Sequence, residues 1–178
     1  MTGLKKAIFI GCIGIVAAGF SFMQGTAKTS GVPDQSAAVK QGTKVTLPDF
    51  KVKDATGKMV NMQDFKGNMV FVNLWATWCG PCRREMPSIE SLYKKLEGKK
   101  VSFVMLSLDD DFTKALNYNK SAKFTFPMYY PAANLPQLFN VDGIPATFIF
   151  NKKGELVKTI QGSINYDTEE FLNLLSGK

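Results

Sequence analysis

Trp78-Cys79-Gly80-Pro81-Cys82 is the stretch that decides the fold of this 178-residue chain. The apolar run Met69–Ala76 before it has the pattern of a buried strand, and Arg83–Leu96 after it has the pattern of a helix. The two cysteines therefore lie where a strand leads into a helix N-terminus. Unpaired backbone N–H groups and the helix dipole favour an anion there, and such sites lower a cysteine pKa from ~8.5 toward ~7 or below. The pattern predicts a reactive dithiol, with the thiolate of Cys79 as the nucleophile because it lies at the helix start and nearer solvent.

Other uses of a cysteine pair fit the sequence less well. A zinc site needs about four ligands, but the chain has no histidine and only one further cysteine, Cys12, so we predict no metal site. A structural disulfide closing so short a loop would restrict the unfolded chain little. A buried, inert pair is disfavoured because Gly80-Pro81 at a helix start leaves the first sulfur near the surface.

Two segments carry a resemblance to a known family. Val70–Pro87 resembles the active-site segment of thioredoxin-like proteins, and most of all the extracytoplasmic TlpA/ResA type. Gly143–Phe150, in which Pro145 opens an apolar strand, resembles the second motif of that family, and the similarity extends from about Thr46 to Leu175. The resemblance implies a thioredoxin-like α/β fold with a central mixed sheet flanked by helices and an N-terminal hairpin extension. Two motifs in the right order are more specific than a lone cysteine pair.

The resemblance also assigns roles around the cysteines. Cys79 and Cys82 would form the redox-active disulfide, with Cys82 resolving a mixed disulfide held by Cys79. Pro145 would be cis and face the cysteines, leaving the backbone of Ile144 free to pair with substrate; the alternative is a proline that only opens a strand. Trp78 would offer substrate an apolar contact at the rim of the site.

Glu85 is the candidate for handling protons at the cysteines. It follows Cys82 by three residues, one helical turn, and ResA-like proteins use an acid at this position. The alternative is an ordinary solvated glutamate on a helix surface. Asn73 strengthens the first interpretation, because thioredoxin carries a buried aspartate there and this chain does not.

The dipeptide between the cysteines favours a reducing protein. Gly80-Pro81 resembles the thioredoxin dipeptide, and without histidine no imidazolium can stabilise the thiolate as in strong oxidants. By resemblance we expect a thiol–disulfide oxidoreductase that reduces oxidised exported proteins such as apocytochrome c. It would need no cofactor and would receive electrons from a membrane thiol-transport protein. The alternatives are a disulfide oxidase or isomerase and a non-enzymatic metal-handling chaperone.

The N-terminal 44 residues form an appendage. Lys5 and Lys6 precede a segment without charge from Ala7 to Ala27, which favours a membrane anchor over a signal peptide cleaved near Ala27. We therefore divide the chain into an anchor or signal (1–27), a flexible tether (28–44) and a thioredoxin-like domain (45–178). The domain would lie on the extracytoplasmic, periplasmic side of the cytoplasmic membrane, or be released there after cleavage. Cys12 is interpreted as a small apolar residue of this segment rather than a lipidation site.

The net charge of +7 does not indicate nucleic-acid binding. Five lysines and one aspartate lie in the appendage, which leaves the domain at +3 with its lysines dispersed. A composition of 45% hydrophobic and 12% aromatic residues is sufficient for a buried core.

The periodicity of the remaining sequence predicts alternating strands and helices. The other expected strands are Val45–Phe50, a hairpin over Lys51–Asn61, Val101–Leu108 and a second hairpin formed by Pro145–Phe150 and Glu155–Gln161. Phe124–Tyr130 is expected to be an extended segment. The other expected helices are Asp111–Lys120, capped by Asp110 or Asp111, a short Leu135–Asn140, and Asp167–Leu175 with a capping box formed by Asp167 and Glu170. Pro87 is expected to bend or restart the helix that follows the cysteines.

Overall fold

The computed structural model describes residues 44–177. The predicted anchor (1–27) and nearly all of the predicted tether lie outside the described residues. Within residues 44–177, no helix has the length and apolar character needed to cross a membrane.

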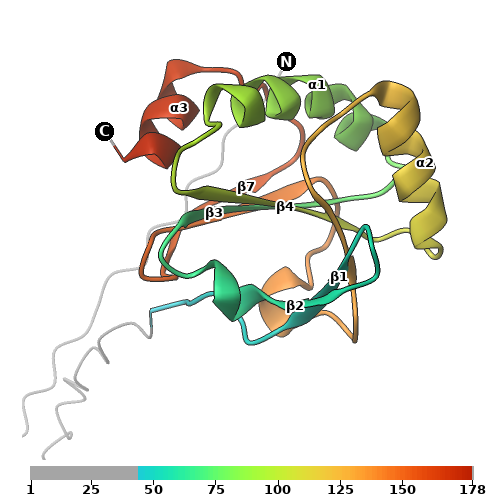
Figure 1. Cartoon of the computed structure of the whole chain (residues 1–178), viewed down its shortest axis with the longest axis horizontal. Coiled ribbons are helices and arrows are strands. Elements are labelled where there is room, and N and C mark those ends of the chain that lie inside the picture. The colour runs from blue at the N-terminus through green and yellow to red at the C-terminus, as the bar shows by residue number, and fades with distance from the viewer. Residues whose placement is uncertain (1–43, 178) are drawn as a thin grey trace, which may run out of the picture. The chain divides into compact units, whose positions relative to one another are not determined.

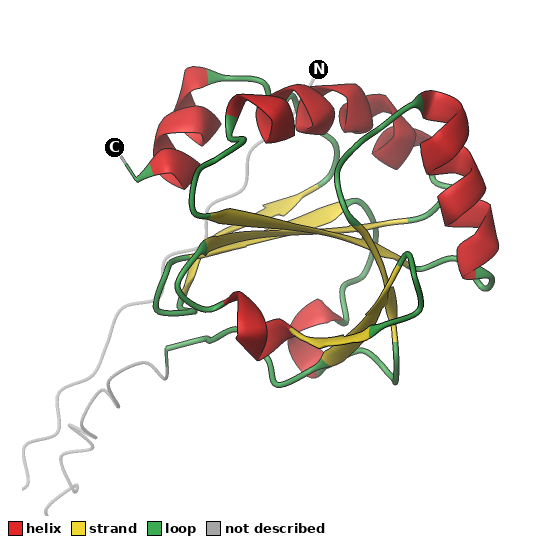
Figure 2. Ribbon diagram, in the orientation of Figure 1, coloured by secondary structure: helices red, strands yellow, loops and turns green. Residues whose placement is uncertain are grey.

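The described chain forms seven strands, three α-helices and two 3-10 helices (Figures 1 and 2). In chain order these are β1 (Lys51–Asp54), β2 (Met59–Asn61), η1 (Met62–Phe65), β3 (Met69–Trp75), α1 (Gly80–Lys95), β4 (Val101–Ser107), α2 (Phe112–Ala122), β5 (Met128–Pro131), η2 (Gln137–Phe139), β6 (Ala146–Phe150), β7 (Leu156–Gln161) and α3 (Glu169–Ser176). All strands join one sheet of order β2-β1-β5-β4-β3-β6-β7. β3, β4 and β5 run parallel and the other neighbours pair antiparallel, so the sheet is mixed as predicted.

The sheet divides the core into two layers. Side chains alternate along β3, so Phe71 and Trp75 pack with α1, α2 and α3, whereas Val70, Val72 and Leu74 pack with the N-terminal segment, η1 and η2. The three α-helices thus cover one face, and the two 3-10 helices lie on the other (Figure 2). All of β3 is buried, which explains why its sequence is a continuous apolar run interrupted only by Asn73.

The helix after the cysteines begins earlier than predicted. α1 starts at Gly80 rather than Arg83, because Pro81 fits the first helical turn, where its missing N–H costs nothing. A restart of the helix at Pro87 is wrong, because α1 continues as one helix from Gly80 to Lys95 with Pro87 inside it. The early start makes Cys79 the N-cap and places both cysteines in the first turn.

The expected strand Val45–Phe50 is wrong in most of its length. Only Thr46 makes an isolated bridge, to Glu155, and Pro48 lies in irregular backbone. Proline lacks the N–H that a ladder requires, which explains why pairing does not continue.

The expected capping box of the last helix is also wrong. Thr168 is the N-cap of α3, and its side chain accepts from the Phe171 N–H. The Asp167 carboxylate binds Ser91 and Lys95 of α1 instead, so it is directed to α1 rather than to the N-terminus of α3. The predicted cap Asp111 is confirmed for α2, where it accepts from the Thr113 N–H at 2.8 Å.

Candidate active site

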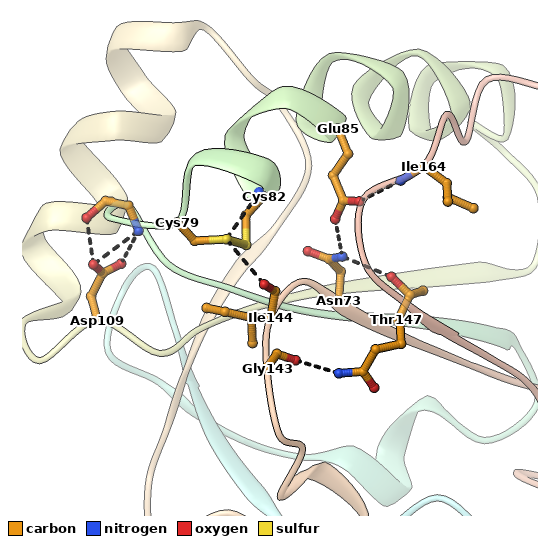
Figure 3. The surroundings of a disulfide bond; sticks show 11 residues. Asn73, Cys79, Cys82, Glu85, Asp109, Gly143, Ile144, Thr147 and Ile164 are labelled. Atoms are coloured by element: carbon orange, nitrogen blue, oxygen red, sulfur yellow. Dashed lines mark hydrogen bonds between the residues drawn. A yellow bond between two sulfur atoms is a disulfide. The ribbon is translucent and has the colours of Figure 1, made fainter.

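Cys79 and Cys82 form a disulfide at the N-terminus of α1 (Figure 3). The backbone N–H of Cys82 donates to the Cys79 sulfur at 3.2 Å, so a free N–H of the first helical turn points at that atom. Cys79 is 5% exposed and Cys82 is fully buried, which leaves Cys79 as the sulfur nearer solvent. A Cys79 thiolate would be stabilised here by the N–H donor and by the helix dipole.

The peptide bond between Ile144 and Pro145 is cis, as the resemblance implies. The carbonyl oxygen of Ile144 lies 3.6 Å from the Cys79 sulfur (Figure 3). Pro145 precedes β6, and the preceding loop is held by Gln161 of β7, which donates to the Gly143 carbonyl at 3.0 Å. The structure therefore brings Ile144 and Pro145 beside the disulfide, although 65 residues separate Ile144 from Cys79.

Trp78 lies next to Cys79 and points away from the core. It is 68% exposed, the largest exposed fraction among the large hydrophobic residues of the described chain. An exposed indole beside a reactive sulfur offers a partner an apolar surface.

Glu85 lies inside the protein, so the interpretation of a solvated surface glutamate is wrong. It is 2% exposed and belongs to the buried stripe of α1 that includes Cys82, Met86 and Ile89. Burial raises the pKa of the Glu85 carboxyl from 4.5 to about 7, although hydrogen bonds from the Asn73 amide and the Ile164 N–H oppose this. In the described chain Glu85 has no ion-pair partner. A carboxyl that titrates near neutrality can take up and release a proton at physiological pH.

Sequence reasoning missed Thr147 and Tyr166, which extend the hydrogen-bond network around Glu85. Asn73 donates to Glu85 at 2.8 Å and to the Thr147 hydroxyl at 2.9 Å, and Thr147 shares a 2.6 Å hydrogen bond with the Tyr166 hydroxyl. Thr147 is fully buried in β6. The one sequence signal that could have singled it out is that it is a polar residue within an otherwise apolar strand. Tyr166 offers no such signal, because it lies in a connecting segment before α3.

Sequence reasoning also missed Asp109, which holds the loop that leads to the disulfide. Its carboxylate is 3% exposed, accepts from the Thr77 N–H at 3.1 Å and from the Thr77 hydroxyl at 2.6 Å, and also binds the Ser107 hydroxyl. Thr77 is two residues before Cys79, so this contact ties the turn to the end of β4. Figure 3 shows Asp109 and Glu85 on opposite sides of the disulfide.

No group of three or more residues suited to metal binding occurs within residues 44–177. The described site brings together a cysteine pair, a buried carboxyl and the backbone carbonyl of Ile144.

Comparison with known proteins shows the family of this chain. Residues 40–175 match the Redoxin family model. The chain is 33% identical over 131 residues to the thiol-disulfide oxidoreductase ResA of Bacillus thuringiensis subsp. konkukian, covering 72% of this chain and 76% of that protein. It is 30% identical over 130 residues to ResA of Bacillus subtilis, covering 72% and 73%.

Solved structures show the same fold. A thiol:disulfide interchange protein described as DsbE, from Chlorobium tepidum, superposes with a TM-score of 0.66 at 28% identity, covering 75% of this chain and 96% of that one. StoA from Bacillus subtilis superposes with a TM-score of 0.56 at 28% identity, covering 65% and 89%. The disulfide at a helix N-terminus, the Ile144 carbonyl beside it and these relatives lead to one conclusion: the chain belongs to the Redoxin family and is a thioredoxin-like thiol–disulfide oxidoreductase with the pair Cys79–Cys82.

Proposed function

We propose that this protein reduces disulfides in exported proteins, such as apocytochrome c, on the extracytoplasmic side of the cytoplasmic membrane. The apolar segment within residues 1–27 would tether it, and a membrane thiol-transport protein would supply its electrons. The location is supported by the charge-free N-terminal segment. Similarity to ResA proteins supports the class of reaction.

One observation carries the proposal. The Cys79 sulfur lies at a helix N-terminus and 3.6 Å from the Ile144 carbonyl, a backbone group that has no backbone partner within residues 44–177. An extended substrate segment can pair with the backbone of Ile144 while its disulfide meets Cys79, and Trp78 can cover its apolar side chains.

The proposed reaction takes two exchange steps. The Cys79 thiolate attacks one sulfur of the substrate disulfide, that S–S bond breaks, and the other substrate sulfur leaves as a thiolate. Cys82 then loses its proton and attacks the Cys79 sulfur, which releases the second substrate thiolate. Two electrons pass to the substrate, and the Cys79–Cys82 disulfide seen in the structure is the product form.

Glu85 would serve the second step. Cys82 is fully buried, so its thiol needs a nearby proton acceptor before it can attack. The Glu85 carboxyl is one turn further along α1 and has a pKa of about 7, close to the working pH of a proton acceptor.

The redox potential should be that of a reductant. Gly80-Pro81 between the cysteines and the absence of histidine leave the thiolate less stabilised than in strong oxidants. Equilibration with glutathione should give a potential below about −220 mV, and a value near about −120 mV would place the protein among the oxidases.

Glu85→Gln should lower the pKa of the Cys79 thiol and slow the reduction of a protein disulfide. The neutral amide no longer opposes a second negative charge in the site, but it cannot accept the proton of Cys82. The pH dependence of Cys79 alkylation measures the first effect, and turnover with a disulfide-bonded protein measures the second. Glu97→Gln is the matched control, because Glu97 is exposed just beyond the other end of α1. If the alkylation profile and the turnover rate of Glu85→Gln equalled those of the unsubstituted protein, Glu85 would have no part in the reaction.

A further inference from the structure

Asn73 has an uneven set of hydrogen bonds. Its Nδ2 donates to Glu85 Oε1 at 2.8 Å and to Thr147 Oγ1 at 2.9 Å, which uses both amide protons (Figure 3). Its Oδ1 is buried and has no partner. Leaving a buried acceptor unpaired is costly, so this arrangement calls for a reason.

The fold places the four residues together by register and packing. Asn73 lies directly opposite Thr147 in the pairing of β3 with β6, so the two side chains share the face covered by α1. Glu85 reaches this face from the buried stripe of α1, and Tyr166 from the segment between β7 and α3.

The groups that meet Glu85 include one other titrating side chain outside α1. Asn73 approaches from β3, and the Ile164 N–H and Tyr166 approach after β7. The pKa of the Tyr166 phenol is raised, mainly by burial, so Tyr166 stays neutral wherever Glu85 titrates. On α1 itself, Cys82 is in the disulfide and does not titrate in this form.

The orientation of the Asn73 amide suits a charged Glu85 better than a protonated one. In the described chain both hydrogen bonds of the carboxyl come from N–H donors, Asn73 Nδ2 and Ile164 N. A protonated carboxyl also carries an O–H donor, which an N–H cannot accept. Rotating the amide by half a turn would present Oδ1 to the Glu85 O–H and to the Thr147 O–H, and Tyr166 would then donate to Thr147.

The position of the unpaired end does not hold the amide in either orientation by a hydrogen bond. In the inverted amide Nδ2 would take that partnerless position, which is costlier than leaving Oδ1 there, and the hydrogen bonds that Oδ1 then accepts from the Glu85 and Thr147 hydroxyls offset this cost. The hydrogen-bonding needs of Glu85 and the freely turning hydroxyl of Thr147 decide the orientation.

We propose that the side-chain amide of Asn73 inverts when Glu85 gains or loses a proton, and that Thr147 and Tyr166 reverse their hydrogen bonds with it. Asn73 is thereby a positioning residue that lets a buried carboxyl exist in both protonation states. The proposal deepens the assignment of Glu85 as proton acceptor and rests on it for its catalytic meaning. The inversion itself can be observed without any assay of reduction.

Nuclear magnetic resonance of the oxidised, full-length chain tests the inversion. Above the Glu85 midpoint, the Asn73 amide protons should show Overhauser contacts with Thr147. These contacts should be lost on acidification, with the same midpoint as the chemical shift of the Glu85 carboxyl carbon. In Glu85→Gln the Asn73 amide should show no such pH dependence. Contacts between the amide protons and Thr147 on both sides of the Glu85 titration would overturn the proposal.

Thr147→Val separates an inverting amide from a fixed one. With Glu85 charged, the variant leaves an Asn73 N–H without an acceptor, whereas the inverted amide of the neutral state loses only one of two donors to a carbonyl oxygen, which is better tolerated. The Glu85 midpoint should therefore rise by about one pH unit or more. A fixed amide would leave its N–H unpaired in both states, and the midpoint of the folded variant would not move.

Thr147→Ser is the matched control, because it keeps the hydroxyl and should keep the original midpoint. Thr147→Ser also keeps the proposal testable if Thr147→Val does not fold. A Glu85 midpoint that rose in Thr147→Ser by the amount expected for Thr147→Val would contradict the role of the hydroxyl. If the amide inverts but Glu85→Gln reduces protein disulfides at the unsubstituted rate, the proposed role of Glu85 is refuted and the inversion stands. A fixed amide with impaired reduction would refute the inversion alone.

Discussion

Cys79→Ser should lower the turnover of protein disulfides by at least about a thousandfold, because a hydroxyl near neutral pH supplies almost no anion to attack sulfur. The measurement is reduction of a disulfide-bonded protein under steady supply of electrons. It is best made in a Cys12→Ser background, so that only the two site cysteines of the three in the chain remain. The fold should persist, because the substitution changes a single side-chain atom from sulfur to oxygen and Cys79 is only 5% exposed.

Cys82→Ala is the partner variant and should fail at a different step. Cys79 can still attack, but nothing releases the substrate, so a mixed disulfide between Cys79 and substrate should accumulate and be visible by mass spectrometry. If instead the Cys79→Ala variant accumulated a mixed disulfide at Cys82, and the Cys82→Ala variant accumulated none at Cys79, the roles of the two cysteines would be reversed.

The oxidised protein should lose stability as pH rises through neutrality, and Glu85→Gln should remove this dependence. Burial raises the pKa of Glu85 from 4.5 in the unfolded chain to about 7 in the folded one, so between these values the native state holds more protons. Stability is therefore fully present below about pH 4.5 and is lost as the folded carboxyl ionises. The free energy of unfolding should be about 2–3 kcal/mol lower at pH 8 than at pH 5.

The sequence makes this experiment unusually clean. The chain has no histidine, and the disulfide keeps Cys79 and Cys82 from titrating. Carboxyls whose pKa is lowered, such as Glu155 and Asp167, are charged in both states above pH 5 and affect stability only below it. Urea unfolding at several pH values gives the profile. Glu97→Gln should keep the slope, and an equal slope in Glu85→Gln would assign it to another group.

Local sequence was sufficient for the centre of the fold. The continuous apolar run of β3, the cysteine pair and the helix after it are neighbours in the chain, and each follows from periodicity and helix-terminus chemistry. The burial of Glu85 could also have been derived, because Cys82, Glu85, Met86 and Ile89 follow the spacing of one helix face. Boundaries were less certain: α1 began three residues early, and Asp167 bound α1 rather than capping α3.

The sequence by itself determined the thioredoxin-like class, through the resemblance of two motifs, and it singled out the pair Cys79–Cys82 and the candidate acid Glu85, which lie within two turns of one helix. Only the tertiary structure decided what surrounds that acid. Thr147 faces Asn73 through the register of two strands 74 residues apart, and Ile164 reaches Glu85 across 79 residues. Such contacts have no local pattern, since strand register and helix docking are set by packing of the whole core. The same packing removes water from Glu85, and the loss of hydration, which no sequence spacing expresses, raises its pKa to about 7.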